Sequence, residues 1–188
     1  MLHELQILVL HFVTSLLVLQ IVVSVLFLLN KVFLAAGEKT GWLWGAIGCL
    51  LAVCYFYRLH LLVYMVLDIG MVVLMTYGYL KKGAKRPLVE LTIQIVSAIV
   101  MVVMAYSAFM GVLTLIELAS AIGILIGTYV LTHGKVRAGW ILYAVANTLT
   151  VVVAFKKHQH IFADFQIAQV VVALYVLFRE QRNRNPLK

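Results

Sequence analysis

Long apolar runs separated by short polar breaks dominate this sequence and limit what it can fold into. Each of seven runs approaches the ~20 apolar residues that an α-helix needs to cross a bilayer. Seven such spans use roughly 140 residues, which leaves only short connections in a chain of 188 residues. We expect the spans at residues 5–36, 42–57, 59–80, 88–110, 113–132, 139–155 and 161–178.

The composition leads to the same fold class. Hydrophobic residues make up 64% of the chain and charged residues 12%, and the mean hydropathy is +1.06. A water-soluble core cannot bury that much apolar surface, so we predict an all-α integral membrane protein with one membrane domain over residues 1–188. The boundaries near Arg58 and Gly111 are the weakest, and losing one of them would leave six spans.

The positions of Lys and Arg predict the orientation of the chain and argue against a nucleic-acid partner. The net charge is +8, but the basic residues lie in small clusters between apolar runs, as residues that set membrane topology do. With the amino terminus outside, all 15 Lys and Arg residues except Arg58, Lys156 and Lys157 fall on the cytoplasmic side, Lys31 included. This bias predicts a cytoplasmic carboxyl terminus and fits a multi-pass protein of the plasma (bacterial inner) membrane.

Two segments 98 residues apart resemble each other and indicate an internal repeat. The shift aligns residues 41–82 with residues 139–180. Scarce residue types match, which chance rarely achieves in two apolar segments. The identical pairs include Gly41 with Gly139, Trp42 with Trp140, Ala46 with Ala144, His60 with His158 and Tyr77 with Tyr175.

This repeat predicts two halves that cross the membrane in the same direction. The first three-helix bundle covers residues 5–82, a connector helix lies within 83–112, the second bundle covers 113–180, and 181–188 form a cytoplasmic tail. The arrangement is a 3+1+3 parallel repeat. Parallel repeats build transporters whose solute site lies near mid-bilayer between the halves and whose access alternates. Transport is therefore the function that the sequence favours.

Both copies of the repeat resemble the PnuC family of vitamin transporters. The first reads GWLWGAIGCLLAVCYFYRLHLLVYMVLDIGMVVLMTYGYLKK and the second begins GWILYAVANTLTVVVAFKKHQH, and the resemblance runs from about Gly41 to Arg179. The family's sixth-helix signature is Trp, two residues, Trp, three residues, Asn. Its places are taken here by Trp140, Tyr143 and Asn147, with tyrosine replacing one tryptophan.

The resemblance implies a function in vitamin uptake by facilitated diffusion. It implies a seven-helix fold related to the SWEET sugar transporters and a homotrimer. We expect no cofactor. Nicotinamide riboside is the leading substrate, with riboflavin, thiamine or a nucleoside as alternatives, and a cytoplasmic kinase traps the solute by phosphorylation. The family also tends to place Trp three residues after the glycine at the end of its third helix, where this chain has Lys81 after Gly78.

The signature residues share one helical face within two turns. Trp140, Tyr143 and Asn147 are spaced i, i+3 and i+7. Aromatic rings stack on a flat heterocycle, and the Asn amide offers a donor and an acceptor for a carboxamide or for ribose hydroxyls. With the resemblance, we predict that they bind substrate; an interfacial Trp anchor and a helix-to-helix Asn bond are the alternative.

Three further polar residues are predicted to bind substrate from the third and seventh helices. Asp68 lies near the middle of its helix, where an unpaired charge costs at least ~2.5 kcal/mol unless it faces protein or water. We expect it to face inward, as an acceptor for hydroxyls or a counter-charge for a cationic ring. Gln166, which the repeat aligns with Asp68, and Gln169 would present amides to the same cavity, although bonds between helices explain both nearly as well.

Four residues are candidates for an entrance or a gate. Glu117 and Ser120 share a face of the fifth helix near the outer surface and would line an entrance or mark the helix end. Tyr77 and Tyr175, equivalent under the repeat, lie near the cytoplasmic ends. They would close the inner mouth or belong to the interfacial aromatic belt.

Other function classes fit less well. A sugar carrier of the same architecture would have Pro kinks in both halves, whereas the prolines are Pro87 and Pro186. A receptor or assembly subunit that binds without transport remains a separate hypothesis. An enzyme is disfavoured because no catalytic triad, His cluster or phosphate loop is apparent. His158 and His160 lie beside lysines in a predicted loop, so no metal site is expected.

Overall fold

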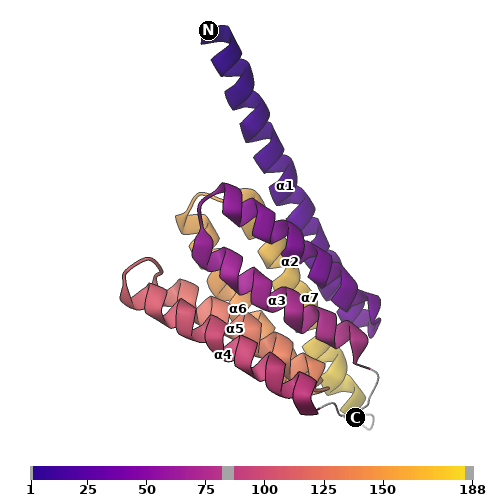
Figure 1. Cartoon of the computed structure of the whole chain (residues 1–188). Helices are drawn as coiled ribbons and strands as arrows, with labels where there is room; N and C mark the ends of the chain where they lie inside the picture. Colours follow the sequence, from indigo (N-terminus) through magenta and orange to yellow (C-terminus); the bar gives the residue numbers. More distant parts are fainter. Residues whose placement is uncertain (1, 82–86, 185–188) are drawn as a thin grey trace.

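The computed structural model describes residues 2–81 and 87–184, and these form seven α-helices (Figure 1). Each helix contains a stretch long and apolar enough to cross a membrane, so the predicted all-α membrane fold is confirmed. In chain order the helices are α1 (Leu2–Ala36), α2 (Thr40–Arg58), α3 (Leu62–Leu80), α4 (Pro87–Phe109), α5 (Leu115–Thr132), α6 (Val136–Lys156) and α7 (His160–Arg184).

The largest differences from the predicted bounds have simple causes. Helix α7 continues to Arg184, beyond the predicted end at Phe178. Hydropathy marks only the part of a helix that lies in the membrane, whereas Arg, Glu and Gln at its end are good helix formers. Helix α3 begins at Leu62 rather than at Leu59, because the residues between belong to a defined turn.

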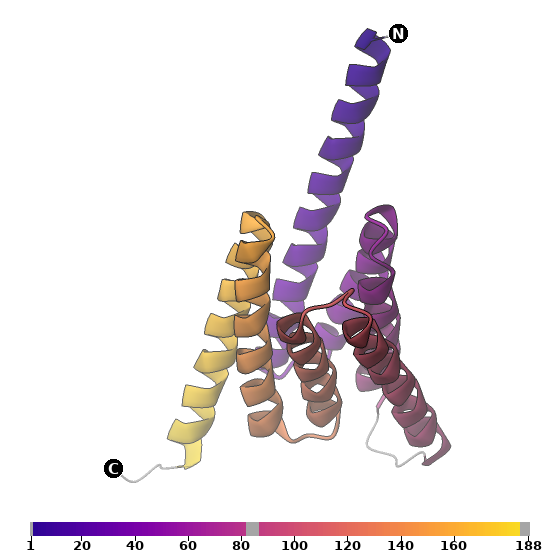
Figure 2. The same ribbon diagram turned by 90° about the vertical axis from the view of Figure 1, so that its left-hand side faces the viewer.

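Six of the helices form a closed ring. Helix α1 packs on α2, α2 on α3, α3 on α5, α5 on α6, α6 on α7, and α7 returns to α1. Helix α4 lies outside this ring, against α3 and α5 (Figures 1 and 2). The first three and the last three helices therefore meet along two seams, α3–α5 and α7–α1, which are equivalent positions in the two halves.

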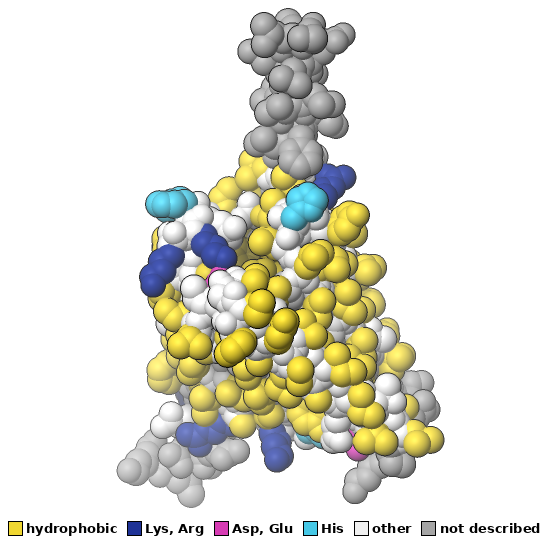
Figure 3. Space-filling view, turned by 60° about the vertical axis from the view of Figure 1, so that its left-hand side comes forward, with side chains coloured by type: hydrophobic (Ala, Val, Ile, Leu, Met, Phe, Trp, Pro, Cys, Tyr) yellow, Lys and Arg dark blue, Asp and Glu magenta, His cyan; other side chains and the backbone are white. Residues whose placement is uncertain are grey.

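Successive helices alternate in direction, so the bundle has two distinct ends (Figure 2). The amino terminus and the α2–α3, α4–α5 and α6–α7 connections lie at one end, called here the N-terminal end. The α1–α2 and α5–α6 connections and the last residues of α7 lie at the other, the C-terminal end. Hydrophobic side chains cover the flank between the ends, and Lys, Arg and His gather at both ends (Figure 3). This distribution is typical of a membrane-spanning bundle.

The α2–α3 and α6–α7 connections have the same backbone structure. His60 and His158, 98 residues apart, have φ values of 55° and 56°. In the first turn the His60 and Leu61 amides donate to the Tyr57 and Phe56 carbonyls at 3.1 and 2.9 Å. The same two bonds occur 98 residues later at 3.1 and 2.9 Å. Each turn is a Schellman ending with His in the left-handed position, so the repeat extends to the backbone.

Two glycines allow close contact among the helices of the first half. A Cβ atom at Gly78 would lie 2.5 Å from the Trp42 ring, so the indole packs directly on the α3 backbone. A Cβ atom at Gly45 would lie 2.6 Å from the Asn30 amide nitrogen. Helices α1 and α3 therefore pack closely against α2, as small residues at helix contacts in membranes permit.

Candidate functional site: a central polar cavity

A cavity of about 160 Å³ lies inside the six-helix ring. Every ring helix contributes to its lining, and none of the described lining residues comes from α4. A single water needs ~10–15 Å³ of such space, so the cavity is large enough for a small organic solute. Its position between the two halves is where a transporter built from a parallel repeat holds its solute.

The lining follows the internal repeat. Pairs of residues 98 apart line the same cavity from opposite halves. This arrangement indicates an approximate two-fold axis that passes through the centre of the ring, roughly parallel to the helices. The pairs are Cys49 and Asn147, Tyr55 and Val153, Phe56 and Ala154, Leu61 and Gln159, Tyr64 and Phe162, Asp68 and Gln166, and Met71 and Gln169. Most pairs differ in chemistry, so the symmetry belongs to the backbone and not to the polar groups.

Four buried amide side chains line the cavity. Three of them, Asn147, Gln166 and Gln169, are predicted substrate-binding residues, and their exposed fractions are 2%, 4% and 3%. The fourth, Asn30, is fixed by a 2.8 Å bond from its Nδ2 to the Gly41 carbonyl. Each keeps one amide atom that bonds to no described residue. An unpaired buried polar atom costs about 1–3 kcal/mol, and these four atoms are available as donors and acceptors to a molecule in the cavity.

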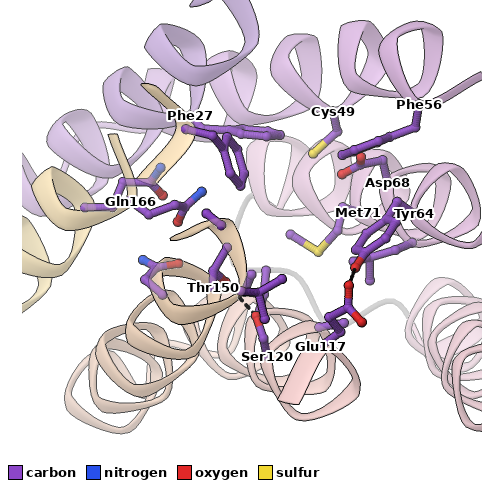
Figure 4. A pocket seen from close by; sticks show the side chains of 18 of the residues that line it. Phe27, Cys49, Phe56, Tyr64, Asp68, Met71, Glu117, Ser120, Thr150 and Gln166 are labelled. Carbon is purple, nitrogen blue, oxygen red and sulfur yellow. Dashed lines mark hydrogen bonds between the residues drawn. The ribbon is translucent and has the colours of Figure 1, made fainter. Parts of the chain in front are cut away.

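Asp68 also faces the cavity. It is 7% exposed, and its carboxyl group and the Cys49 sulfur point toward one another (Figure 4). Phe27, Phe56 and Tyr64 place aromatic rings around the same space (Figure 4). The cavity therefore combines rings, amides and a carboxyl group, which suits a solute that has both a flat ring and polar substituents.

The other two signature residues are not part of the lining. Trp140 and Tyr143 are 2% and 0% exposed and lie edge to face, with ring centroids 5.8 Å apart. The Tyr143 hydroxyl shares a 2.7 Å hydrogen bond with Thr128. On α6, Tyr143 lies one helical turn before Asn147 and Trp140 lies two turns before it, toward the C-terminal end. Both rings pack there beside Ala35. Of the three predicted residues, only Asn147 reaches the cavity.

Glu117 organises a cluster at the N-terminal end of the cavity, called here the Glu117 cluster. Glu117 is 4% exposed, and Tyr64 donates a 2.5 Å hydrogen bond to its Oε1. Lys157, at the end of α6, forms an ion pair with the same oxygen. Thr114 donates to Oε2 from both its backbone amide and its hydroxyl at 2.8 Å. The cluster joins α3 to α5 across one seam.

The remaining gate candidates lie in different surroundings. Ser120 lines the cavity and shares a 2.6 Å hydrogen bond with Thr150 (Figure 4). Tyr77 donates a 3.2 Å hydrogen bond to Glu90 of α4 and is half-buried. Tyr175 is 61% exposed on α7. The structure therefore brings Glu117 and Ser120 to the cavity, whereas Tyr77 and Tyr175 are not among the described lining residues.

Lys31 is a lining residue that the sequence analysis assigned to the membrane surface. It is 5% exposed and faces the cavity from α1, so it is not a surface marker of topology. The available signal was its position inside the apolar run at 5–36, five residues before the end of the helix. An ionisable residue within a span is a candidate functional residue by default.

The chain matches a known family of proteins. A family model described as nicotinamide mononucleotide transporter matches residues 17–181. No curated protein and no solved structure matches the chain significantly. The family match covers all seven helices except the beginning of α1 and the last residues of α7, and it agrees with the resemblance found in the sequence. The chain belongs to the nicotinamide mononucleotide transporter (PnuC) family of membrane transporters.

Proposed function

We propose that this protein facilitates the diffusion of a ribosylated, ring-containing vitamin precursor, with nicotinamide riboside as the first candidate. The observation that carries the proposal is the set of four buried amides, each with an unpaired atom, around one cavity between two repeated halves. Structural amides would be expected to pair with each other. These amides instead leave donors and acceptors for a solute.

The chemistry of nicotinamide riboside fits this lining. Its carboxamide and ribose hydroxyls are hydrogen-bond partners for the amides of Asn147, Gln166 and Gln169. Its flat pyridinium ring suits contact with an aromatic side chain such as Phe27, and its positive charge suits Asp68. Riboflavin, thiamine and nucleosides share only part of this set, and they remain the alternatives within the same function.

Alternating access requires a closure at each end of the cavity. We propose that the Glu117 cluster closes the N-terminal end, because it bridges the α3–α5 seam. Trp140 and Tyr143 would close the C-terminal end in this conformation and would contact the solute when that end opens. Tyr77 and Tyr175 remain predicted gate residues at that end.

We also propose how the chain is divided into halves, how it is oriented in the membrane and which partners it has. The two halves would be 5–82 and 113–180, joined by the connector within 83–112. The N-terminal end would face the outside and the tail at 181–188 the cytoplasm of a bacterial cell, as the charge bias predicts. The family resemblance further implies a homotrimer and a cytoplasmic kinase that phosphorylates the solute after its release.

A ligand panel tests the proposal. The purified protein in detergent is heated with nicotinamide riboside, riboflavin, thiamine, nucleosides and hexoses, because a ligand of the native state raises its stability. We expect one vitamin to raise the midpoint of thermal unfolding, and we expect Asn147→Ala to lose this shift. Thr148→Ala is the matched control, because Thr148 is exposed and bonds only within its own helix.

Flux into liposomes separates a carrier from a receptor. A carrier should equilibrate the same vitamin across the bilayer, whereas a receptor should bind it without flux. Absence of both a shift and flux with every compound would reject the transport of vitamins by this protein.

A further inference from the structure

Lys31 lines the cavity, and its ammonium group lies over an aromatic ring. Its Nζ lies 3.3 Å from the centroid of the Tyr143 ring. That ring is fixed, since Tyr143 is 0% exposed and its hydroxyl is bonded to Thr128. The Lys31 side chain is 5% exposed and belongs to the cavity lining. A solute in the cavity would therefore meet the Lys31 side chain.

Among the described residues, this ammonium has no anionic partner. The ion pairs of the described residues involve Glu90 and Glu117, and neither joins Lys31. No hydrogen bond from Lys31 to a described residue is present either. A cation–π contact returns only part of what burial of an ammonium costs. Lys157, the other basic lining residue, is already paired with Glu117. Lys31 is the cation of the cavity that is available to a ligand.

The number and placement of charges define the anion that fits. A phosphate carries nearly two charges and is usually bound by several donors or by arginine. The described lining has one unpaired lysine and no arginine. A carboxylate carries a single charge that one ammonium balances. Lys31 and Asp68 both line the cavity, so a basic and an acidic side chain are available to the same solute.

We propose that Lys31 binds a carboxylate on the aromatic ring of the solute, so that the cavity prefers the acid form of a pyridine riboside to its carboxamide form. The preferred solute is a zwitterion whose carboxylate contacts Lys31 and whose pyridinium ring lies toward Asp68. The inference rests on the proposed function and refines it, since within that solute class it ranks the acid riboside above nicotinamide riboside. It makes Lys31 a specificity-determining residue that the family signature does not include.

The test compares three solutes that share one ring system. Binding to the full-length protein in nanodiscs is measured by calorimetry for nicotinic acid riboside, nicotinamide riboside and nicotinamide mononucleotide. A hydrogen bond between charged groups is worth one to two powers of ten in affinity. We therefore expect the wild type to bind the acid riboside about ten- to a hundredfold more tightly than the carboxamide riboside, and to bind the phosphorylated solute more weakly than the acid.

The variant Lys31→Met removes the charge and keeps the unbranched chain. It should lose the preference for the acid riboside over nicotinamide riboside, and its thermal midpoint without ligand shows whether it is folded. Lys39→Met is the matched control, because Lys39 is exposed and its replacement should change neither affinity.

Three results would overturn the proposal while leaving the proposed function intact. They are equal wild-type affinities for the acid and the carboxamide, a preference for the acid that survives in Lys31→Met, and tightest binding of the phosphorylated solute. The wild-type comparison alone decides the first and third, so the test holds even if Lys31→Met fails to fold. Failure of the wild type to bind any of the three would instead count against the proposed function.

Discussion

Removal of the Tyr64 hydroxyl should open the N-terminal end of the cavity. Its 2.5 Å bond to Glu117 joins α3 to α5 across a seam. In Tyr64→Phe the carboxylate keeps Lys157 and Thr114 as partners, so the fold should be retained. A hydrogen bond to a charged group contributes about 1.5–3 kcal/mol. If it exists only in the closed state, the open population should rise about ten- to a hundredfold or slightly more.

Cysteine modification measures this population directly. Cys49 is 1% exposed and lines the cavity, whereas Cys54 is exposed. In a Cys54→Ser background, a water-soluble, membrane-impermeant thiosulfonate added at the N-terminal end should reach Cys49 only when that end opens. When the cavity closes much faster than the reagent reacts, the rate of Cys49 modification is proportional to the fraction of molecules whose N-terminal end is open. The rate in Tyr64→Phe should then rise by the same factor of ten or more.

Tyr57→Phe is the matched control for this experiment. Tyr57 is 65% exposed at the end of α2, so loss of its hydroxyl should leave the modification rate unchanged. The reasoning is refuted if Cys49 is modified at the wild-type rate in Tyr64→Phe, or if Tyr57→Phe raises the modification rate of Cys49 by the same factor. The first result would mean that Tyr64 bonds Glu117 equally in both states, and the second that a general loosening explains the effect.

Two substitutions test the packing of the bundle. Arg179→Ala removes a 2.7 Å hydrogen bond to the Ala35 carbonyl that joins α7 to the end of α1. The loss should lower the free energy of unfolding by about 1.5–3 kcal/mol and the thermal midpoint by several degrees. Arg182→Ala, at an exposed position of the same helix, should leave the midpoint unchanged. Gly78→Ala places a methyl group against Trp42, and overpacking of about 1–3 kcal/mol should exceed the helix-propensity gain of about 1 kcal/mol. A raised midpoint in Gly78→Ala, or equal effects of the two Arg variants, would contradict this description of the packing.

The number and placement of the helices follow from hydropathy because lipid forces each span to be long and apolar. Inward-facing polar residues are predictable for a related reason. Asp68, Asn147, Gln166 and Gln169 are isolated polar groups in apolar helices, and such groups avoid lipid. All four line the cavity. What the sequence could predict of the site is therefore its mid-helix polar groups.

The rest of the lining depends on packing that no local pattern contains. A lysine near a helix end normally extends its ammonium to the membrane surface, whereas Lys31 is buried because α1 packs between α2 and α7. Trp140 and Tyr143 share the face of Asn147, as their spacing predicts, but Ala35 and neighbouring residues cover them. Phe27 could not be distinguished from the other apolar residues of its helix.

The matching pairs across the cavity have a consequence for how a solute is oriented. A cavity produced by duplication begins with two identical walls, and a solute turned by half a revolution would find the same contacts. Divergence has removed that degeneracy, since Asn147 faces Cys49, Gln166 faces Asp68 and Gln169 faces Met71 across the two-fold axis. Only one of the two orientations can satisfy both walls, so we expect an asymmetric solute to bind in a single pose, although the backbone around it is nearly symmetric.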